Sequence, residues 1–298
     1  MTSLKFESLR KRYLAGLLLT GIAAAALSQS AIAGPFILDL TDADDHGFSD
    51  GTANQDGWLY MQRVLETLAP GVTNSQMTVV NLGSNQSTQA YNAAFSSFSL
   101  SGLSGMGWNW VNINGAIDIA AFFDGTGTYN INNTGIIQID SGSSNVTGGI
   151  STDELAVVNT NATVLDNFLG NGGALHSLAE DTGGQYGWLG TLLPGLTFNT
   201  FQDQGLFLTA DGQSAFPGLT NSDLSAGPFH GTWTGGLGGL TTLFTNSNGN
   251  AVGIGSGGGS VTNPEPPSTG VPEPSGFILF GAGLVAIRLA MKRRRHLA

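Results

Sequence analysis

Residues 135–140 read GIIQID, residues 151–173 read STDELAVVNTNATVLDNFLGNGG, and residues 174–179 read ALHSLA; these three pieces decide the fold. The first and last pieces are short apolar runs, which predict buried strands. The middle piece carries apolar side chains at alternating spacings of three and four from Leu155 to Leu169, as on one face of a helix. A strand, a helix and a second strand in this order predict a parallel β-α-β unit with a right-handed crossover.

Both ends of this predicted helix carry a boundary signal. Ser151 and Glu154 have the spacing of a capping box, in which each side chain accepts a hydrogen bond from the other residue's backbone N–H. Gly170 and the pair Gly172-Gly173 favour a helix end after residue 169. We therefore expect one continuous helix between these signals.

The chain before residue 135 repeats the alternation of strand and helix. PFILDLT at 35–41 and MTVVNL at 77–82 predict two more strands. Helical periodicity follows each run, first at Trp58, Met61, Leu65 and Leu68, and then at Tyr91, Ala94, Phe95 and Phe98. This order predicts an α/β domain with a three-layer open, mainly parallel sheet.

Other segments are less regular. Residues 99–134 are Gly- and Asn-rich insertions, in which 117–123 (IDIAAFF) fit a strand or a helix equally well. Beyond Gly187, short apolar runs alternate with Gly, Asn and Asp. TTLFTN at 241–246 and AVGIG at 251–255 flank a turn-forming segment and predict a C-terminal β-hairpin.

The block from Gly135 to Leu178, with FLGNGG between its helix and second strand, resembles the class I glutamine amidotransferase-like or ThuA-like α/β fold. This resemblance implies an open, flavodoxin-like arrangement of strands. In the amidotransferases the turn after the second strand carries a cysteine, whereas here it reads Ala179-Glu180-Asp181. The chain has no cysteine, so we expect the fold without the amidotransferase chemistry.

The amino-terminal residues 1–33 have the organisation of a secretory signal peptide. Basic residues between Lys5 and Arg12 precede an apolar run at 14–27, and Ala31-Ile32-Ala33 supplies a small-x-small cleavage pattern. We expect cleavage between Ala33 and Gly34, which leaves an acidic α/β domain at 34–254.

The carboxyl end has three parts in fixed order. Val271, Pro272, Glu273 and Pro274 form an extended motif, residues 276–291 are an apolar run interrupted only by Arg288, and a basic cluster follows at Lys292, Arg293, Arg294 and Arg295. The apolar run fits a transmembrane helix, with the cations on the cytoplasmic side. A Gly- and Pro-rich segment at 255–270 predicts a flexible linker to this tail.

This arrangement at 271–298 resembles the PEP-CTERM sorting signal of Gram-negative bacteria. The resemblance implies export, recognition by an exosortase, and an inner-membrane precursor that reaches the cell surface or extracellular matrix. The expected partners are therefore the secretion machinery, the exosortase and the membrane.

The charge of the chain is divided unevenly. Nine of its ten basic residues lie at the two ends, so residues 34–287 carry only Arg63 against twenty carboxylates, a formal net charge of −19. Such a body has no basic surface for phosphates, which excludes nucleic acid as a partner. It could bind cations, a cationic surface or a neutral exopolysaccharide, or the charge could serve solubility alone.

The acidic loop at 42–50 is a candidate cation site because it follows the first predicted strand. Carboxylates at Asp42, Asp44, Asp45 and Asp50 are the hard oxygen ligands that calcium prefers. The calcium-loop template is incomplete, since position 5 is His46 and position 12 is Ala53. A solvated acidic loop is the alternative, and we expect no other cofactor.

A candidate nucleophile lies in the same region. Residues 47–51 read GFSDG and match the G-x-S-x-G pattern, with His230 as the possible base of Ser49 and an Asp at 211 or 223 as third member. Ser49 lies well beyond the end of the first strand, whereas a nucleophile elbow needs the serine between strand and helix. His176 fits a core histidine, and the aromatics Trp108, Trp110 and Trp233 would suit a sugar-stacking surface or the core.

We therefore expect an exported cell-envelope or matrix protein whose acidic α/β domain is a binding or structural module and not an enzyme. The alternative is a secreted hydrolase acting on polysaccharide or ester bonds. A nucleophile close to its base would favour the hydrolase.

Overall fold

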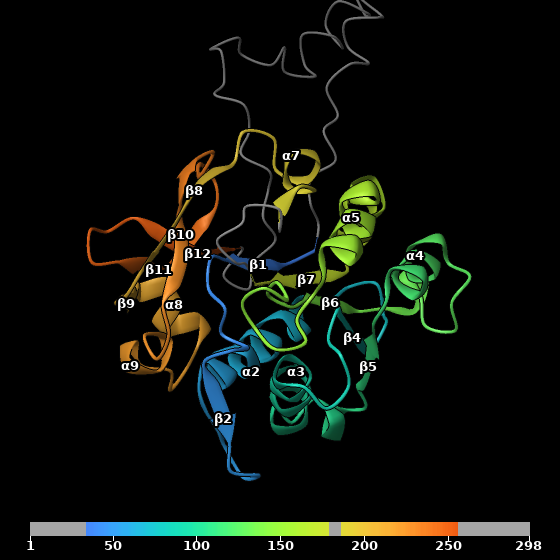
Figure 1. The fold of residues 1–298 in the computed structure, drawn as a ribbon, viewed down its shortest axis with the longest axis horizontal. Helices are drawn as coiled ribbons and strands as arrows, with labels where there is room; N and C mark the ends of the chain where they lie inside the picture. Colours follow the sequence, from blue (N-terminus) through green and yellow to red (C-terminus); the bar gives the residue numbers. More distant parts are fainter. Residues whose placement is uncertain (1–33, 179–185, 256–298) are drawn as a thin grey trace, which may run out of the picture. The chain divides into compact units, whose positions relative to one another are not determined.

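The computed structural model describes residues 34–178 and 186–255, within which eight strands form one mixed sheet (Figure 1). Its first five strands are parallel and lie in the order β5-β4-β6-β7-β1. They span Asn109–Ile113 (β5), Thr78–Leu82 (β4), Ile136–Ile139 (β6), Ala174–Ser177 (β7) and Phe36–Asp39 (β1). The predicted α/β class with a mainly parallel sheet is confirmed.

The sheet continues beyond β1 with antiparallel strands. The predicted C-terminal hairpin forms as β11 (Thr241–Asn246) and β12 (Ala251–Gly255), and β12 pairs directly with β1. Strand β9 (Leu206–Leu208) completes this side. The residues that the structure describes also pair β8 (Thr197–Asp203) with β10 (Phe229–Gly235). Strands β12, β11 and β9 therefore extend the sheet beyond β1, on the side away from β7.

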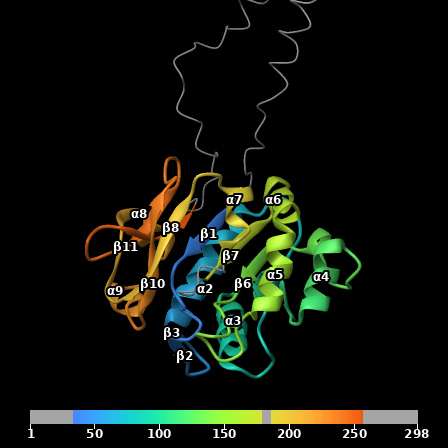
Figure 2. The same cartoon turned by 45° about the horizontal axis from the view of Figure 1, so that its top comes forward.

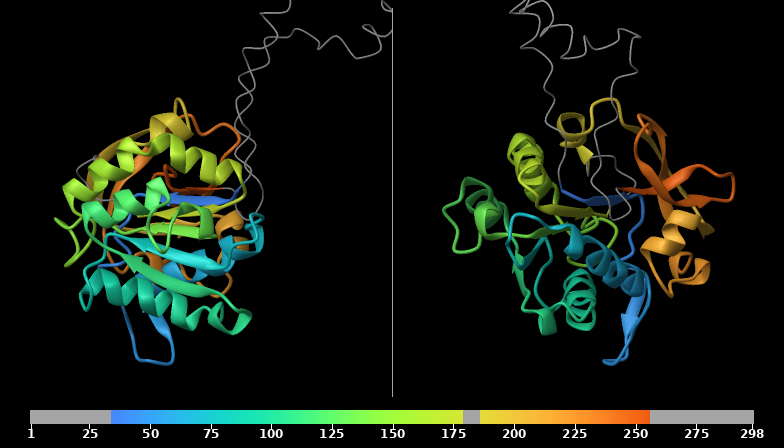
Figure 3. Two further views of the ribbon diagram at one scale, coloured as in Figure 1. Left: turned by 90° about the vertical axis from the view of Figure 1, so that its right-hand side faces the viewer. Right: turned by 180° about the vertical axis from the view of Figure 1, so that it is seen from behind.

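Helices cover both faces of the parallel strands, so the domain has three layers (Figure 3). One face carries α2 (Gly57–Leu68) and α3 (Gln89–Leu100). The other face carries α4 (Ala116–Asp124), α5 (Thr152–Thr160) and α6 (Ala162–Gly170). Shorter helical turns are η1 (Ala69–Gly71), η2 (Ser104–Met106), η3 (Ile131–Asn133), α7 (Leu189–Leu192), α8 (Ala210–Ala215) and α9 (Asn221–Leu224).

A short hairpin interrupts the first crossover. Strands β2 (Gly47–Ser49) and β3 (Asn54–Asp56) pair with each other and lie beside α2 and α3 (Figure 2). Asn54 fixes this hairpin, because its side chain bonds the Gln62 amide of α2 at 3.0 Å and the Ser96 hydroxyl of α3 at 2.6 Å. The hairpin therefore takes up the second half of the acidic loop and separates it from the first half.

The predicted capping box is present, but the helix that follows it is not continuous. Glu154 Oε2 accepts from the Ser151 N–H at 2.7 Å, as expected. The helix then breaks at Asn161, whose φ and ψ are −97° and 19°. The Asn161 side-chain amide donates to the Val157 carbonyl at 2.9 Å, so it competes with the backbone for that acceptor. This local competition replaces the single predicted helix with α5 and α6.

The irregular region before residue 135 takes a definite form. Residues 117–123, which fitted a strand or a helix, lie in α4. Gly115 and Gly125 have φ of 95° and 81° and flank this helix at its two caps. A positive φ of this size is accessible to glycine but strained for other residues, so the two glycines determine where α4 begins and ends.

The three tryptophans do not form one sugar-stacking surface. Trp108 and Trp233 are buried, and only Trp110 is partly exposed. Trp233 packs against Tyr186 and Phe198, and its indole N–H donates to the Val252 carbonyl at 2.9 Å. The core interpretation is therefore correct for Trp108 and Trp233, and Trp233 on β10 packs toward β12 of the main sheet.

Some predictions concern residues outside 34–178 and 186–255. These are the signal peptide before its Ala33–Gly34 boundary, the turn at 179–181, the linker and the sorting tail. No helix among the described residues has both the length and the apolar character needed to cross a bilayer.

Candidate metal centre

The loop that follows β1 places carboxylates at the carboxyl edge of the parallel sheet. Asp42 and Asp44 are 2% and 0% exposed, so this part of the acidic loop is not solvated. Asp44 accepts hydrogen bonds from Ser141, directly beyond β6, at 3.0 Å from its N–H and 2.5 Å from its hydroxyl. These bonds fix the loop across the sheet edge, which is where open α/β sheets bind ligands.

Three nitrogen atoms converge on one oxygen of Asp42. His46 Nε2 lies 3.2 Å from Asp42 Oδ2, and His230 Nε2 lies 3.1 Å from the same atom. Asn145 Nδ2, from the loop after β6, approaches it to 2.5 Å. The three nitrogens come from segments far apart in the chain, so only the fold assembles this cluster.

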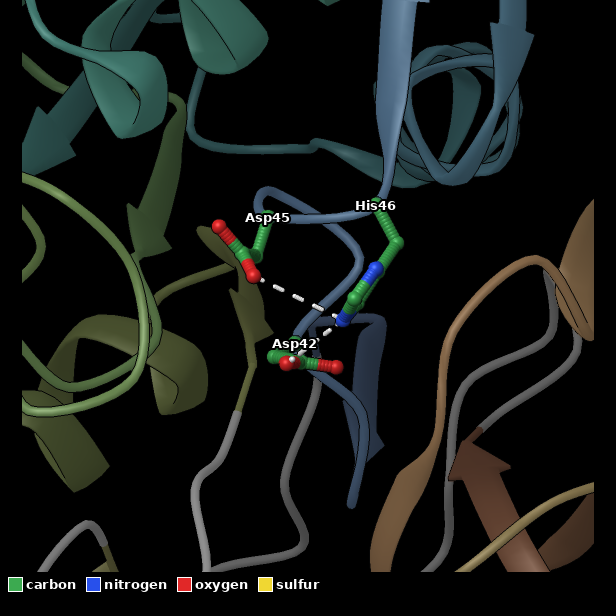
Figure 4. A group of neighbouring side chains, drawn as sticks. All are labelled: Asp42, Asp45 and His46. Atoms are coloured by element: carbon green, nitrogen blue, oxygen red, sulfur yellow. Dashed lines mark ion pairs between the residues drawn. The ribbon is translucent and has the colours of Figure 1, made fainter.

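Asp45 adds a second carboxylate to the cluster (Figure 4). Its Oδ2 lies 3.5 Å from His46 Nε2, and the ligand atoms of Asp42, Asp45 and His46 all lie within 4.8 Å of one another. A cavity of about 10 Å³ borders Asp42 and His46. That volume is close to the minimum for one water molecule, so it also suits one small ion.

Electrostatics keep the central carboxylate ionised. Burial by itself raises the pKa of Asp42, but hydrogen bonds from His230 and His46 and their charges outweigh it and lower this pKa to about 2. The hydrogen bond to Asp42 in turn raises the pKa of His46 above its usual value. Among the described residues, the buried Asp42 Oδ1 and His230 Nδ1 have no hydrogen-bond partner. The cluster therefore has an anionic centre and an acceptor that the protein leaves unused.

This donor set suits a borderline metal better than a hard one. Calcium takes oxygen ligands, whereas zinc binds imidazole nitrogen together with carboxylate oxygen. Bonds of about 2.0–2.1 Å in a tetrahedral site place neighbouring donors about 3.3–3.4 Å apart. His46 Nε2 lies 3.2 Å from Asp42 Oδ2 and 3.5 Å from Asp45 Oδ2, which is close to this spacing, whereas His230 Nε2 lies near Asp42 Oδ2 without belonging to this group of three.

The predicted calcium ligands are only partly brought together. Asp42 and Asp45 belong to the cluster with His46, whereas Asp44 accepts a hydrogen bond from the Ser141 hydroxyl. Asp50 lies in the turn between β2 and β3, where its Oδ1 accepts from Thr52 and from the Ala53 N–H at 2.8 Å. The hairpin separates Asp50 from the other three, because it turns the chain away from the sheet edge.

Two cluster members were not predicted as ligands. His46 occupied a position of the calcium template where oxygen was expected, and His230 was considered only as a base. The run Asp-x-Asp-Asp-His at 42–46 was the sequence signal that could have identified His46 as a ligand. For Asn145 and His230 the sequence holds no signal, because their position depends on the loop after β6 and on β10.

The predicted nucleophile pair does not assemble. Ser49 lies in β2, with its hydroxyl donating to the Ala53 carbonyl at 3.3 Å and accepting from the Gly51 N–H at 3.1 Å. His230 Nε2 instead contacts Asp42 and Asn145. Ser49 also lacks the strand-to-helix turn of a nucleophile elbow. The G-x-S-x-G match is thus part of an ordinary hairpin.

A second polar group is buried beside the cluster. Asp140 Oδ2, just after β6, accepts hydrogen bonds from the Ser84 hydroxyl and from Asn81 Nδ2. Burial raises the pKa of Asp140 well above its ordinary value, and the nearby Asp44 raises it further. Burial likewise raises the pKa of Asp44. Asp140 therefore favours the protonated form and is a poor metal ligand, whereas Asp44, with its pKa raised to about 7, is only partly ionised at neutral pH.

A third cluster of buried polar side chains fixes the carboxyl end of β1. Asp39 Oδ2 accepts from the Tyr60 hydroxyl at 2.8 Å and lies 3.2 Å from His176 Nε2. Asp39 Oδ1 accepts from the Thr41 N–H at 3.0 Å and its hydroxyl at 2.6 Å. Asp39, Tyr60 and His176 are completely buried, which confirms His176 as a core histidine. Asp39 thereby orients the loop that carries the metal centre.

Comparison with protein-family models, with curated proteins and with solved structures gives no match to this chain.

Proposed function

We propose that this chain is an exported cell-envelope protein whose acidic α/β domain binds a divalent metal ion of the zinc class. The ion would be held by Asp42, Asp45 and His46, with His230 orienting the Asp42 carboxylate. The observation that supports this most strongly is that the ligand atoms of Asp42, Asp45 and His46 all lie within 4.8 Å of one another. One imidazole and two carboxylates gathered in this way form a donor set for zinc.

Metal binding is tested by thermal unfolding of the purified chain in zinc, in calcium and in chelator. A metal that binds only the folded state stabilises it by about 2.7 kcal/mol at a hundredfold excess over its Kd. For a domain of this size that corresponds to a rise in Tm of about 5–10 °C. We expect this rise with zinc and a much smaller one with calcium.

Two variants separate this ligand set from the calcium-loop template. His46→Gln removes a nitrogen donor and should abolish most of the zinc-dependent rise in Tm. Asp50→Asn keeps the acceptor for Thr52 and Ala53 in its turn, so it is the matched control and should respond to zinc like the wild type. Coincident melts in zinc and chelator, or an unaltered zinc response of His46→Gln, would refute the site.

Export and sorting are supported by the order of signals in the sequence. A cleavable signal at 1–33 would deliver the domain across the membrane, and the tail at 271–298 would hold the precursor for an exosortase. The domain would then be released or anchored at the cell surface, where its strong negative charge favours cations.

Replacing Pro272, Glu273 and Pro274 by alanine tests the sorting proposal in the native host. We expect the variant to accumulate as a full-length membrane form, because the extended motif before the apolar run is lost. Mass spectrometry of the carboxyl terminus and the extracellular yield measure this. An unchanged mature terminus and yield would show that the motif does not direct processing.

A further inference from the structure

A second concave site lies at the opposite, amino-terminal edge of the parallel strands. It is a groove of about 220 Å³ bordered by the segment before β4, by η3 before β6, and by the end of α6 before β7. The metal centre follows the carboxyl ends of β1 and β6, so the two sites are separate. We propose that this groove binds one unit of a neutral polysaccharide.

Carboxamide side chains dominate the wall of this groove. Gln76, Asn132, Asn167 and Asn171 all line it, and within the described part of the chain their side-chain amides make no hydrogen bond. Each carboxamide offers both a donor and an acceptor, which is the combination that neighbouring sugar hydroxyls require. Four unused amides at one groove therefore form a surface for a hydroxyl-rich ligand.

The fifth amide gives the groove a fixed shape. Asn74 Nδ2 donates to the Thr134 carbonyl at 2.9 Å, and its Oδ1 accepts from the Gln76 N–H at 3.0 Å. These bonds connect the segment before β4 to the segment before β6. The wall that carries Gln76 is consequently held by the protein itself, which reduces the entropy cost of binding.

Apolar side chains provide the remaining surface. Ile131, Val164 and Phe168 also line the groove; Ile131 and Val164 are half-buried and offer apolar surface, whereas Phe168 is buried. A pyranose ring presents C–H groups on its faces and hydroxyls at its rim, so it matches an apolar surface bordered by amides. The volume is below the roughly 300–1,000 Å³ of sites for drug-sized ligands, which favours a single sugar unit.

Charge supports a neutral ligand. None of the described residues that line the groove is charged, although residues 34–287 contain twenty carboxylates. A cation would lack a carboxylate here, and an anion would meet a negative body without a lysine or arginine in the groove. Neutral sugars are not subject to either restriction.

The test titrates the purified full chain with methyl glycosides of glucose, galactose and mannose, and with dextran, by calorimetry and ligand-observed NMR. We expect binding of at least one neutral glycoside at millimolar concentration and weaker binding of glucuronate. Asn167→Ala and Asn132→Ala should each weaken binding about three- to tenfold, because each removes one net hydrogen bond. Asn248→Ala, in the exposed turn between β11 and β12, is the control and should bind like the wild type.

Each titration is run in zinc and again in chelator, so failure here is distinguishable from failure of the metal centre. Binding that is equal in both conditions supports an independent groove. Absence of binding to every neutral glycoside, equal affinity in the groove variants and the wild type, or preference for a neutral peptide would overturn the proposal.

Discussion

Replacing Asp39 by alanine is expected to lower the free energy of unfolding by about 3–5 kcal/mol, because it leaves several buried polar groups without a partner at about 1–3 kcal/mol each. The substitution leaves the buried Tyr60 hydroxyl and His176 Nε2 without their acceptor. It also removes both hydrogen bonds that Asp39 accepts from Thr41. Each buried group left without a partner destabilises the folded state, because the native hydrogen bond no longer offsets the free energy of its desolvation.

Denaturant unfolding of the purified protein in chelator measures this effect. Asp39→Asn keeps one carbonyl oxygen for Thr41 and adds a donor toward Tyr60, so it should cost only about 1 kcal/mol. Asp118→Ala, on the exposed side of α4, should change stability by less than about 0.5 kcal/mol. A loss below about 1 kcal/mol for Asp39→Ala would show that this group does not hold the end of β1.

Asp140→Asn is expected to make the protein more stable than the wild type at neutral pH, and increasingly so as pH rises. The folded pKa of Asp140 is raised by burial and by the charges of Asp44 and Glu154, against the lowering effect of Ser84 and Asn81. Above the unfolded pKa of about 3.9, the folded wild type holds a proton that the unfolded chain has released. Stability then falls by up to ~1.4 kcal/mol per pH unit until the folded pKa is passed.

The asparagine variant lacks this titration. Its gain over the wild type should therefore reach up to ~2.7 kcal/mol between pH 5 and pH 7. Because the charge of Asp44 acts on Asp140, the difference between the two stability curves reports the titration of this pair, whereas His46 titrates in both proteins. Denaturant titrations across this range in chelator give the curves. Parallel curves would mean that Asp140 is ionised in the folded protein throughout this range.

Helices and strands whose apolar residues recur at a regular spacing could be predicted from the sequence. Four of the parallel strands and helices α2 and α3 follow from apolar spacing, because each depends on neighbours within the same segment. The break at Asn161 could not be predicted this way, since a side chain there competes for a backbone acceptor. The irregular 99–134 segment depends on glycine conformations that composition does not reveal.

For the candidate site, the sequence indicated the loop but not the ligands. Asp42 and Asp45 lie in a conspicuous acidic run, and the rule for open α/β sheets places that run at the ligand-binding edge. Asp44 has the same side chain, yet the structure directs it to Ser141. The difference arises because the N–H and hydroxyl of Ser141, a residue distant in the sequence, donate hydrogen bonds to Asp44 alone.

The sequence by itself determined the α/β class and the uneven charge, because both depend on composition and local order, whereas the signals at the two ends stay predictions. Only the tertiary structure decided that His230 and Asn145 meet Asp42, since long-range pairing brings together residues that no local pattern relates. The same holds for the amide groove, whose walls come from three crossovers that meet at one edge of the sheet. Local interactions select elements, whereas packing of the sheet and its helices selects which side chains become neighbours.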